Sequence, residues 1–501
     1  MLLRRLLTWK PQQGYPFKCG LEIHTQLKTK FKLFSLSKND PDSPPNTNAS
    51  YFDYGLPGTF PQLNPEALLL ALKAATALNS NISELCHFDR KHYFYLDQPM
   101  GYQLTQHHRP LAKGGQLHLT KKYDNVSEDH TIRIDQIQLE QDTGKMNYNE
   151  YDGAITVDLN RANVPLIELV TEPDFKNIEQ VKSFVRKYLT LMSHLGVCSG
   201  DMEKGAMRCD VNISVNGGKR VEVKNLGSTS EIVAAATYEY NRQVEHLKTS
   251  DEPIIQETRA WDGKSTYRRR DKEDANDYRY MPDTEIPGIF LSPQIGEEIR
   301  AILPELPEEI LDKLTTEPYC LEIKHARFLV DNVDILKYYL DLYEYGCIGA
   351  MLDIKTVNNW LLHELLGAFH KLEVPFDRTA ISPRSLTELM VMVKKDKITF
   401  SSAKLLLLQL LQLDPKERHL PMHELVEKYD LGSANSASTK DLDEAITEIC
   451  QDIIAANPDV VEKIQNGKSN SINHLIGLAM RQTQGKVNSK EFERVFKNLI
   501  N

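Results

Sequence analysis

The sequence predicts an α+β protein with a strand-rich domain first, an all-helical domain second and a small helical tail last. Residues 20–290 consist largely of short alternating runs separated by Gly, Pro and Asn, which is typical of strands and turns. From residue 308 onward, apolar residues recur at helical spacing and strand signals nearly vanish. A chain of 501 residues is also too long for one hydrophobic core, so we expect several domains.

The composition is that of a soluble globular protein, with 41% hydrophobic and 26% charged residues. No run of about 18 apolar residues is present, so we expect no membrane span. The net charge of -10 excludes a surface that is basic all over, but it allows a local basic patch for nucleic acid. The seven cysteines lack CxxC spacing, which predicts free thiols in a reducing compartment rather than a disulfide framework.

The first 17 residues have the composition of a mitochondrial targeting segment. Arg4 and Arg5 lie beside leucines at positions 2, 3, 6 and 7, and no acidic residue precedes Glu22. The alternative is a frayed basic N-terminus. The segment predicts localisation in the mitochondrial matrix.

The strand-rich domain is expected over 18–295, with three helices among its strands. The first helix follows Asn64, an N-cap residue, and begins at Pro65. The other two are expected near 178–195 and 229–247. A proline-rich joint over 282–307 leads into the helical domain, expected over 296–430. The tail is expected over 431–501, and it begins with a linker of small residues at 431–441.

The stretch GLEIHTQL at 20–27 alternates as a half-buried strand does. Leu21 and Ile23 point to one side, whereas Glu22 and His24 point to the other. A carboxylate and an imidazole two residues apart on one face are the beginning of a ligand set. Taken alone, an ordinary surface strand explains the pattern equally well.

Two later segments place further acids in half-buried strands. The apolar residues of 132–145 slip in phase between 134 and 137, which suggests a β-bulge before Glu140. Glu168 lies inside the otherwise apolar run NVPLIELV, a costly position for an unpaired carboxylate.

Residues 205–226 read as a β-hairpin around the NGG turn. A three-residue loop at 217–219 would pair Asn212 with Lys224 and would place Asp210 and Glu222 on one face.

Carboxylates collected on one face repel one another unless cations share the space. Oxygen-rich ligands with one imidazole suit a hard divalent ion, most simply Mg²⁺. The nearby cations Lys91, Arg161 and Arg208 would then suit phosphate oxygens. From spacing alone, metal-dependent phosphoryl chemistry and a salt-bridged sheet face both remain open.

Longer motifs around these residues resemble a known family, the B subunits of tRNA-dependent amidotransferases. The resemblance is dense from about residue 18 to 290 and weaker but continuous to the C-terminus. The stretches that carry it are GLEIHTQL, LPGTFPQLN, FDRKHYFYLDQPMGYQLTQ, VDLNRANVPLIELVTEPDF, GDMEKGAMRCDVNISV, VEVKNL and DYRYMPDTEIP.

The resemblance implies a catalytic cradle domain that binds ATP, Mg²⁺ and the aminoacyl end of glutamyl-tRNA(Gln). It implies that the side-chain carboxylate of the misacylated glutamate is phosphorylated. Ammonia from a partner, the amidase (glutaminase) of the complex, then displaces phosphate to give glutaminyl-tRNA(Gln). The family usually adds a small third subunit. The sequence leaves open whether aspartyl-tRNA(Asn) is also a substrate.

The resemblance also assigns roles by position. It implies that Glu22 and His24 are metal ligands, and that four other acids belong to the metal and nucleotide pocket: Glu140, Glu168, Asp210 and Glu222. It places Lys91, Arg161 and Arg208 in matched motifs as phosphate contacts. We expect catalysis to depend on Glu22, His24, Glu140 and Glu168.

Three departures from the family pattern are visible. Gln141 stands where many bacterial members have an acid, which leaves the number of metal ions open. The positions of four zinc-binding cysteines in many bacterial members correspond to Ser35, Ser37, Ser50 and Asp53, so we expect no structural zinc. KNLGSTS replaces KNLNSF after Glu222.

The tail is rich in cations, and the family match favours tRNA contact there over a merely solvated face. Lys468 and Lys486 follow glycines at expected turns, and Arg481 lies between them. Two other hypotheses remain: a non-catalytic tRNA-holding protein with a decayed pocket, and an unrelated two-metal phosphoesterase.

Overall fold

The computed structural model describes residues 8–149, 151, 153–202, 205–271, 278–413, 420–431, 439–465, 471–483 and 487–500. The chain divides into two compact units, Met1–Ile310 and Leu311–Asn501. The first is strand-rich and the second helical, which confirms the predicted α+β class. Among the described residues, none of the helices combines the length and apolar character needed to cross a membrane.

Thirteen strands of the first unit form one sheet. Its central path runs β15-β14-β13-β12-β1-β11-β8-β5-β4-β16, and β2, β6 and β7 join beside it. These strands are β1 Phe17–Gln26, β2 Asn81–Ile82, β4 Asp89–His92, β5 Tyr102–Thr105, β6 Ala112–Lys113, β7 Gln116–Leu119, β8 His130–Gln141, β11 Pro165–Thr171, β12 Met207–Val215, β13 Val221–Leu226, β14 Glu257–Trp261, β15 Thr266–Asp271 and β16 Met281–Pro282. Two small sheets pair β9 (Lys145–Tyr148) with β10 (Ile155–Asp158), and β3 (Leu85–Cys86) with β17 (Ile289–Phe290).

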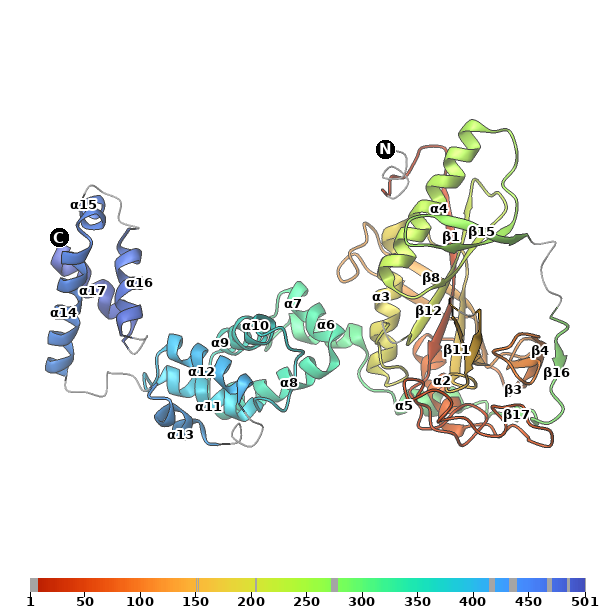
Figure 1. Cartoon of the computed structure of the whole chain (residues 1–501), viewed down its shortest axis with the longest axis horizontal. Helices are drawn as coiled ribbons and strands as arrows, with labels where there is room; N and C mark the ends of the chain where they lie inside the picture. Colours follow the sequence, from red (N-terminus) through yellow and green to blue (C-terminus); the bar gives the residue numbers. More distant parts are fainter. Residues whose placement is uncertain are drawn as a thin grey trace. The chain divides into compact units, whose positions relative to one another are not determined.

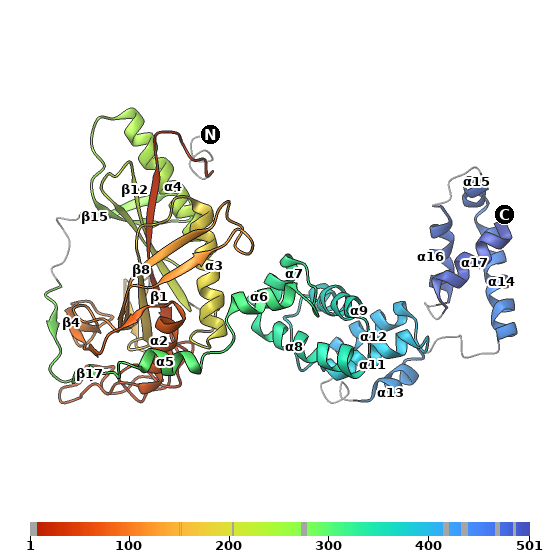
Figure 2. The same cartoon turned by 180° about the vertical axis from the view of Figure 1, so that it is seen from behind.

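One face of the large sheet is covered by helices and carries the core. The long helices α3 (Ile178–His194) and α4 (Thr229–Thr249) run side by side along it (Figures 1 and 2). Helix α2 (Pro65–Ala77) also packs there, and α5 (Ile295–Ala301) packs against α2. The predicted boundary at residue 295 therefore falls just before a helix that still belongs to the first unit.

The predicted helices of this unit are confirmed, and so is the first N-cap. The Asn64 side chain accepts a hydrogen bond from the Glu66 N–H, and Pro65 is the first helical residue. Asn177 and Ser228 cap α3 and α4 in the same way. These caps satisfy backbone donors that a helix start leaves free.

The register of two strand pairs tests the finer predictions. The bulge in β8 is confirmed, because Val170 pairs with Gln136 while Thr171 pairs with Ile134. The pairing predicted for the hairpin is wrong, since Asn212 faces Glu222 rather than Lys224. The turn is centred one residue earlier, where Asn216 and Gly217 both have positive φ (54° and 67°). A shift of this size preserves the faces, so Asp210 and Glu222 still share one.

The second unit is built from short helices around two separate cores. Its first group comprises α7 Ile323–Asp331, α8 Val333–Tyr343, α9 Ile354–Asn359, α10 Leu366–Lys371, α11 Pro383–Lys394, α12 Phe400–Gln412 and α13 Met422–Lys428, with π-helical turns at Glu344–Gly349 and Trp360–Leu365. Helix α6 (Pro307–Thr315) spans the boundary between the units. The tail comprises α14 Thr439–Ala456, α15 Pro458–Gln465, α16 Ile472–Gln482 and α17 Ser489–Ile500, which pack around Leu475, Phe492 and Phe496. Most of the predicted linker, residues 432–438, lies outside the described residues.

Candidate metal and nucleotide site

Strand β1 supplies the centre of the site, as its alternation predicts. Leu21 and Ile23 are buried against the helices, at 1% and 0% exposure. Glu22 and His24 project from the opposite face of the sheet. The functional pair therefore stands on a central strand whose other side is fixed in the hydrophobic core.

The register of the neighbouring strands brings the other acids to this face. His24 lies opposite Glu168 on β11, and Glu22 lies opposite Asp210 on β12. Asn212, two residues beyond Asp210, faces Glu222 on β13. Residues separated by up to 200 positions in the sequence thus meet through strand pairing.

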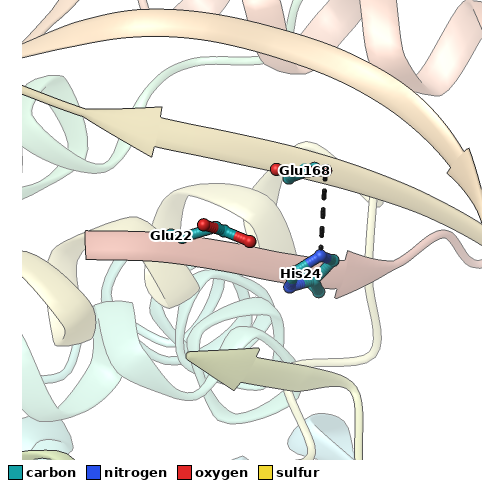
Figure 3. A group of neighbouring side chains, drawn as sticks. All are labelled: Glu22, His24 and Glu168. Atoms are coloured by element: carbon teal, nitrogen blue, oxygen red, sulfur yellow. Dashed lines mark ion pairs between the residues drawn. The ribbon is translucent and has the colours of Figure 1, made fainter. Parts of the chain in front are cut away.

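Two groups of three side chains have the spacing of metal ligands. Glu22, His24 and Glu168 offer ligand atoms that all lie within 4.8 Å of one another, and so do Glu22, Asp210 and Glu222. Figure 3 shows the first group, with His24 Nε2 3.8 Å from Glu168 Oε2. Because Glu22 belongs to both groups, the arrangement suits two cations joined by a shared carboxylate.

Glu140 lies beside the first group, with its Oε1 3.7 Å from His24 Nε2. Its position is fixed by Gln103 on β5, whose Nε2 donates to Glu140 Oε1 at 3.0 Å. Gln138 on β8 similarly donates to Glu168 Oε2 at 2.8 Å. These two amides orient the carboxylates, and neither was predicted from the sequence. The alternation of the predicted strands could have placed Gln138 on the face of Glu140.

Proximity of the charges shifts the pKa values in opposite directions. Burial works against the imidazolium form of His24, but Glu140, Glu168 and Glu22 outweigh it and raise its pKa to about 9. Burial together with the charge of Glu140 raises the pKa of Glu168 to about 8. Although burial opposes ionisation, Lys91 and His24 hold the pKa of Glu140 well below its usual range.

The second group is balanced by Lys224. Its Nζ lies 2.8 Å from Asp210 and 3.3 Å from Glu222. Burial disfavours the ammonium form, yet these two carboxylates outweigh it and raise the pKa of Lys224. The backbone N–H of Asn225, which has a positive φ of 61°, donates to Asp210 Oδ1 at 2.7 Å. The irregular pairing of β12 with β13 thus holds Asp210 in place.

The three cations predicted as phosphate contacts lie in different settings. Lys91 on β4 faces the first group, and its pKa is raised because Glu140 and Glu168 outweigh the effect of burial. Arg208 Nη2 pairs with Asp142 Oδ1 at 2.8 Å. Arg161 donates to the carbonyls of Thr143 and Gly144, which gives it a role in holding that turn.

Tyr278 and Tyr280 form a wall beside Lys91 that was not predicted from the sequence. The Lys91 Nζ lies 4.9 Å from the centre of the Tyr278 ring. Tyr280 stacks on His107 with ring centres 3.8 Å apart. The backbone here follows β4, since the N–H of His92 donates to the Tyr278 carbonyl at 2.9 Å. No local periodicity marks these residues.

Gln141, the residue that left the number of metal ions open, points away from the acidic face. It follows Glu140 on the same strand and is 3% exposed. Its Oε1 accepts a hydrogen bond from the Leu104 N–H at 3.0 Å. The amide therefore serves strand pairing and takes no ligand position from the cluster.

The positions that correspond to zinc-binding cysteines surround a buried ion pair. Lys32 Nζ lies 3.2 Å from Asp53 Oδ2, and both side chains are fully buried. Asp53 also accepts hydrogen bonds from Ser35 Oγ and the Ser50 N–H. Hydroxyls, one paired carboxylate and an ammonium group do not suit Zn²⁺, which prefers thiolate and imidazole.

The predicted tRNA-binding residues of the tail are only partly described. Arg481 is exposed in the last turn of α16. Lys468 and Lys486 lie outside the described residues.

The fold and this face define a class of protein: a sheet scaffold whose carboxylates and one imidazole can hold hard divalent cations beside lysines that can meet phosphate. Two family models match the chain, described as the GatB/GatE catalytic domain over residues 17–297 and the GatB domain over residues 346–500. Together they cover most of the 501 residues. The chain belongs to the GatB family.

Full-length relatives agree with this assignment. A protein of Clavispora lusitaniae is 60% identical over 500 residues, covering 100% of this chain and 94% of that protein. Relatives from Debaryomyces hansenii and Scheffersomyces stipitis are 58% and 54% identical over 98% and 99% of this chain, and over 96% and 97% of their own lengths. All three are named as the B subunit of mitochondrial glutamyl-tRNA(Gln) amidotransferase.

Proposed function

We propose that this chain is the B subunit of a mitochondrial ligase that converts glutamyl-tRNA(Gln) to glutaminyl-tRNA(Gln), with glutamine as the amido donor. The observation that carries the proposal is the pair of ligand groups that share Glu22. High identity to relatives of that name, over nearly their full length, supports the choice of substrate.

The reaction proceeds in two steps. An oxygen of the glutamate side chain attacks the γ-phosphorus of ATP, and ADP leaves with the electrons of the broken P–O bond. Ammonia then attacks the carbonyl carbon of the acyl phosphate, phosphate leaves, and the nitrogen loses a proton to give the amide. Phosphorylation is needed because an unmodified carboxylate oxygen is a poor leaving group.

The residues of the acidic face would hold Mg²⁺, which offsets the charge between ATP and the incoming carboxylate. Glu22 is central because it belongs to both ligand groups. Lys91, with Glu140 and Glu168 beside it, is placed to meet a phosphate or carboxylate oxygen. Arg208 and Arg161 support the face by fixing Asp142 and its turn.

The proposal requires other proteins. An amidase (glutaminase) partner supplies ammonia from glutamine, and a small third subunit completes the enzyme. The relatives are named as one lettered component of an amidotransferase, which supports an assembly of several subunits. No structural zinc is proposed, in keeping with the donors around Asp53.

The hypothesis of a decayed, non-catalytic pocket depended on Gln141. Because that amide is directed to the Leu104 N–H, its presence costs the acidic face no ligand. A two-metal phosphoesterase would use the same acids but would need neither charged tRNA nor ammonia.

The test is amide formation on glutamyl-tRNA(Gln) with ATP, Mg²⁺ and ammonium chloride, in complex with the amidase partner. Free ammonia bypasses the glutaminase and isolates the chemistry of this chain. We expect wild type to form glutaminyl-tRNA(Gln), and His24→Ala to lose at least about a hundredfold in rate.

His246→Ala is the matched control, because His246 lies at the end of α4, away from the acidic face. It should keep wild-type activity. Equal activity of His24→Ala and wild type would overturn the site assignment. ATP hydrolysis that needs neither tRNA nor ammonia would favour the phosphoesterase instead.

A further inference from the structure

A second hollow lies at the start of β1, outside the acidic cluster. Its volume is about 620 Å³, and it is formed by the start of β1, strands β7 and β8, the turn at 173–176 and the tip of the β12–β13 hairpin. Four of the residues that line it carry or can carry positive charge: Lys18, His130, Arg133 and Lys176. We call it the basic pocket.

The charge of the basic pocket is only partly balanced. Of its described lining residues, Asp174 is the one acid, and it is engaged by Arg133, with Nη2 2.8 Å from Oδ1 and Nε 2.9 Å from Oδ2. The exposed ammonium groups of Lys18 and Lys176 have no partner among the described residues. Two cations are therefore left for a ligand.

The basic pocket is close to the acidic cluster but separate from it. Lys18 precedes Glu22 by four residues on β1 and therefore shares its face, at roughly 13 Å by strand geometry. Gly20 lies between them, and a Cβ there would be 3.5 Å from Pro173 Cα. The turn at Pro173 thus lies over β1 between the two sites.

We propose that the basic pocket binds backbone phosphate of the RNA substrate next to its aminoacylated end. The inference rests on the proposed function. ATP brings its phosphates to the acidic cluster, where cations can be held. A second group of cations roughly 13 Å away suits a ligand whose phosphates repeat along a chain, which is the chemistry of RNA. Lysines that lack an acidic partner suit phosphate better than a neutral base.

The test compares two double variants of the full complex. Lys18→Gln with Lys176→Gln removes the two free charges. Lys182→Gln with Lys264→Gln removes two exposed charges elsewhere, on α3 and in the β14–β15 turn. For both variants, KM is measured for glutamyl-tRNA(Gln) and for ATP, together with tRNA binding as a function of salt.

We expect the basic-pocket variant to raise the KM for tRNA several-fold and to lower the salt slope of binding by about one to two. The kcat and the KM for ATP should stay unchanged, and the control variant should match wild type. Lys18→Arg with Lys176→Arg should restore tRNA binding, because arginine also pairs with phosphate. Thermal unfolding of each variant distinguishes lost contacts from lost folding.

Unchanged tRNA binding and an unchanged salt slope would overturn the proposal. A raised KM for ATP alone would also overturn it, since it would assign the basic pocket to the nucleotide. If wild type binds tRNA but forms no amide, the proposed function fails, while the binding comparison still decides the phosphate site.

Discussion

At the scale of single residues, neighbouring groups of the same chemistry have different protonation states. Glu140 and Glu168 flank one histidine, yet Lys91 and His24 favour ionisation of Glu140, whereas burial and the charge of Glu140 oppose ionisation of Glu168. His24 holds a proton between them, with a pKa of about 9. Without a cation, the cluster therefore replaces part of the missing positive charge with protons.

Cation binding should consequently release protons. Mg²⁺ and its analogue Mn²⁺ require a neutral imidazole and an ionised Glu168, and both groups are protonated below their raised pKa values of about 9 and 8. We expect the affinity for Mn²⁺ to rise between pH 6 and 8, by up to about tenfold per pH unit for each proton released. Calorimetry in two buffers of different ionisation enthalpy counts those protons. Affinity that is independent of pH would contradict the assignment of His24 as a ligand.

The buried pair of Lys32 and Asp53 predicts a second residue-scale effect. Lys32→Met leaves the Asp53 carboxylate buried without its cation, which should lower the free energy of unfolding by about 3 kcal/mol. Adding Asp53→Asn should recover part of that loss, because the amide can still bond its neighbours. Urea unfolding measures both. Lys38→Met, at an exposed pair with Asp40, is the control and should change stability by less than about 0.5 kcal/mol.

At the scale of elements, local patterns predicted much of the site. The alternation of β1 placed Glu22 and His24 on one face, and the phase slip before Glu140 located the bulge in β8. The turn of the β12–β13 hairpin was misplaced by one residue, because Asn216 tolerates a positive φ as well as glycine does. The contributions of Gln103 and Tyr278 could not be read from the sequence, since they depend on which distant strands and segments become neighbours.

The start of the chain permits a prediction about the predicted targeting segment. Residues 8–17 belong to the packing of the first unit: Trp9 contacts Phe17 and Tyr240, with ring centres 5.3 and 4.9 Å apart. The Asn241 side chain also donates to the Thr8 carbonyl. Removing residues 1–7 should leave stability unchanged, whereas removing 1–16 should cost about 2 kcal/mol through the lost aromatic contacts.

Thermal unfolding of the two truncated proteins tests this difference. Mass spectrometry of the protein isolated from mitochondria gives the mature N-terminus, which we expect at or before Thr8. A mature chain that begins at Phe17 or later would show that these contacts are dispensable.

At the scale of the whole molecule, composition and pattern predicted the order of the parts but not their division of labour. The net charge of -10 requires that any RNA contact be local. The first unit carries the acidic face and the basic pocket, whereas the cations predicted to contact tRNA lie in the tail, on and near α16. Chemistry and long-range tRNA binding are thus expected to separate between the two units.

This separation makes a final prediction with two substrates. Changing Lys468, Arg481 and Lys486 to Gln should raise the KM for full-length glutamyl-tRNA(Gln) several-fold, because backbone contacts far from the aminoacyl end are lost. The same variant should use a short acceptor-stem RNA carrying glutamate as well as wild type does, with unchanged kcat. The variant of Lys18 and Lys176 should instead be impaired on both RNAs. If the tail variant also lost activity on the short RNA, the tail would be needed for the chemistry itself, and the proposed division of labour would be wrong.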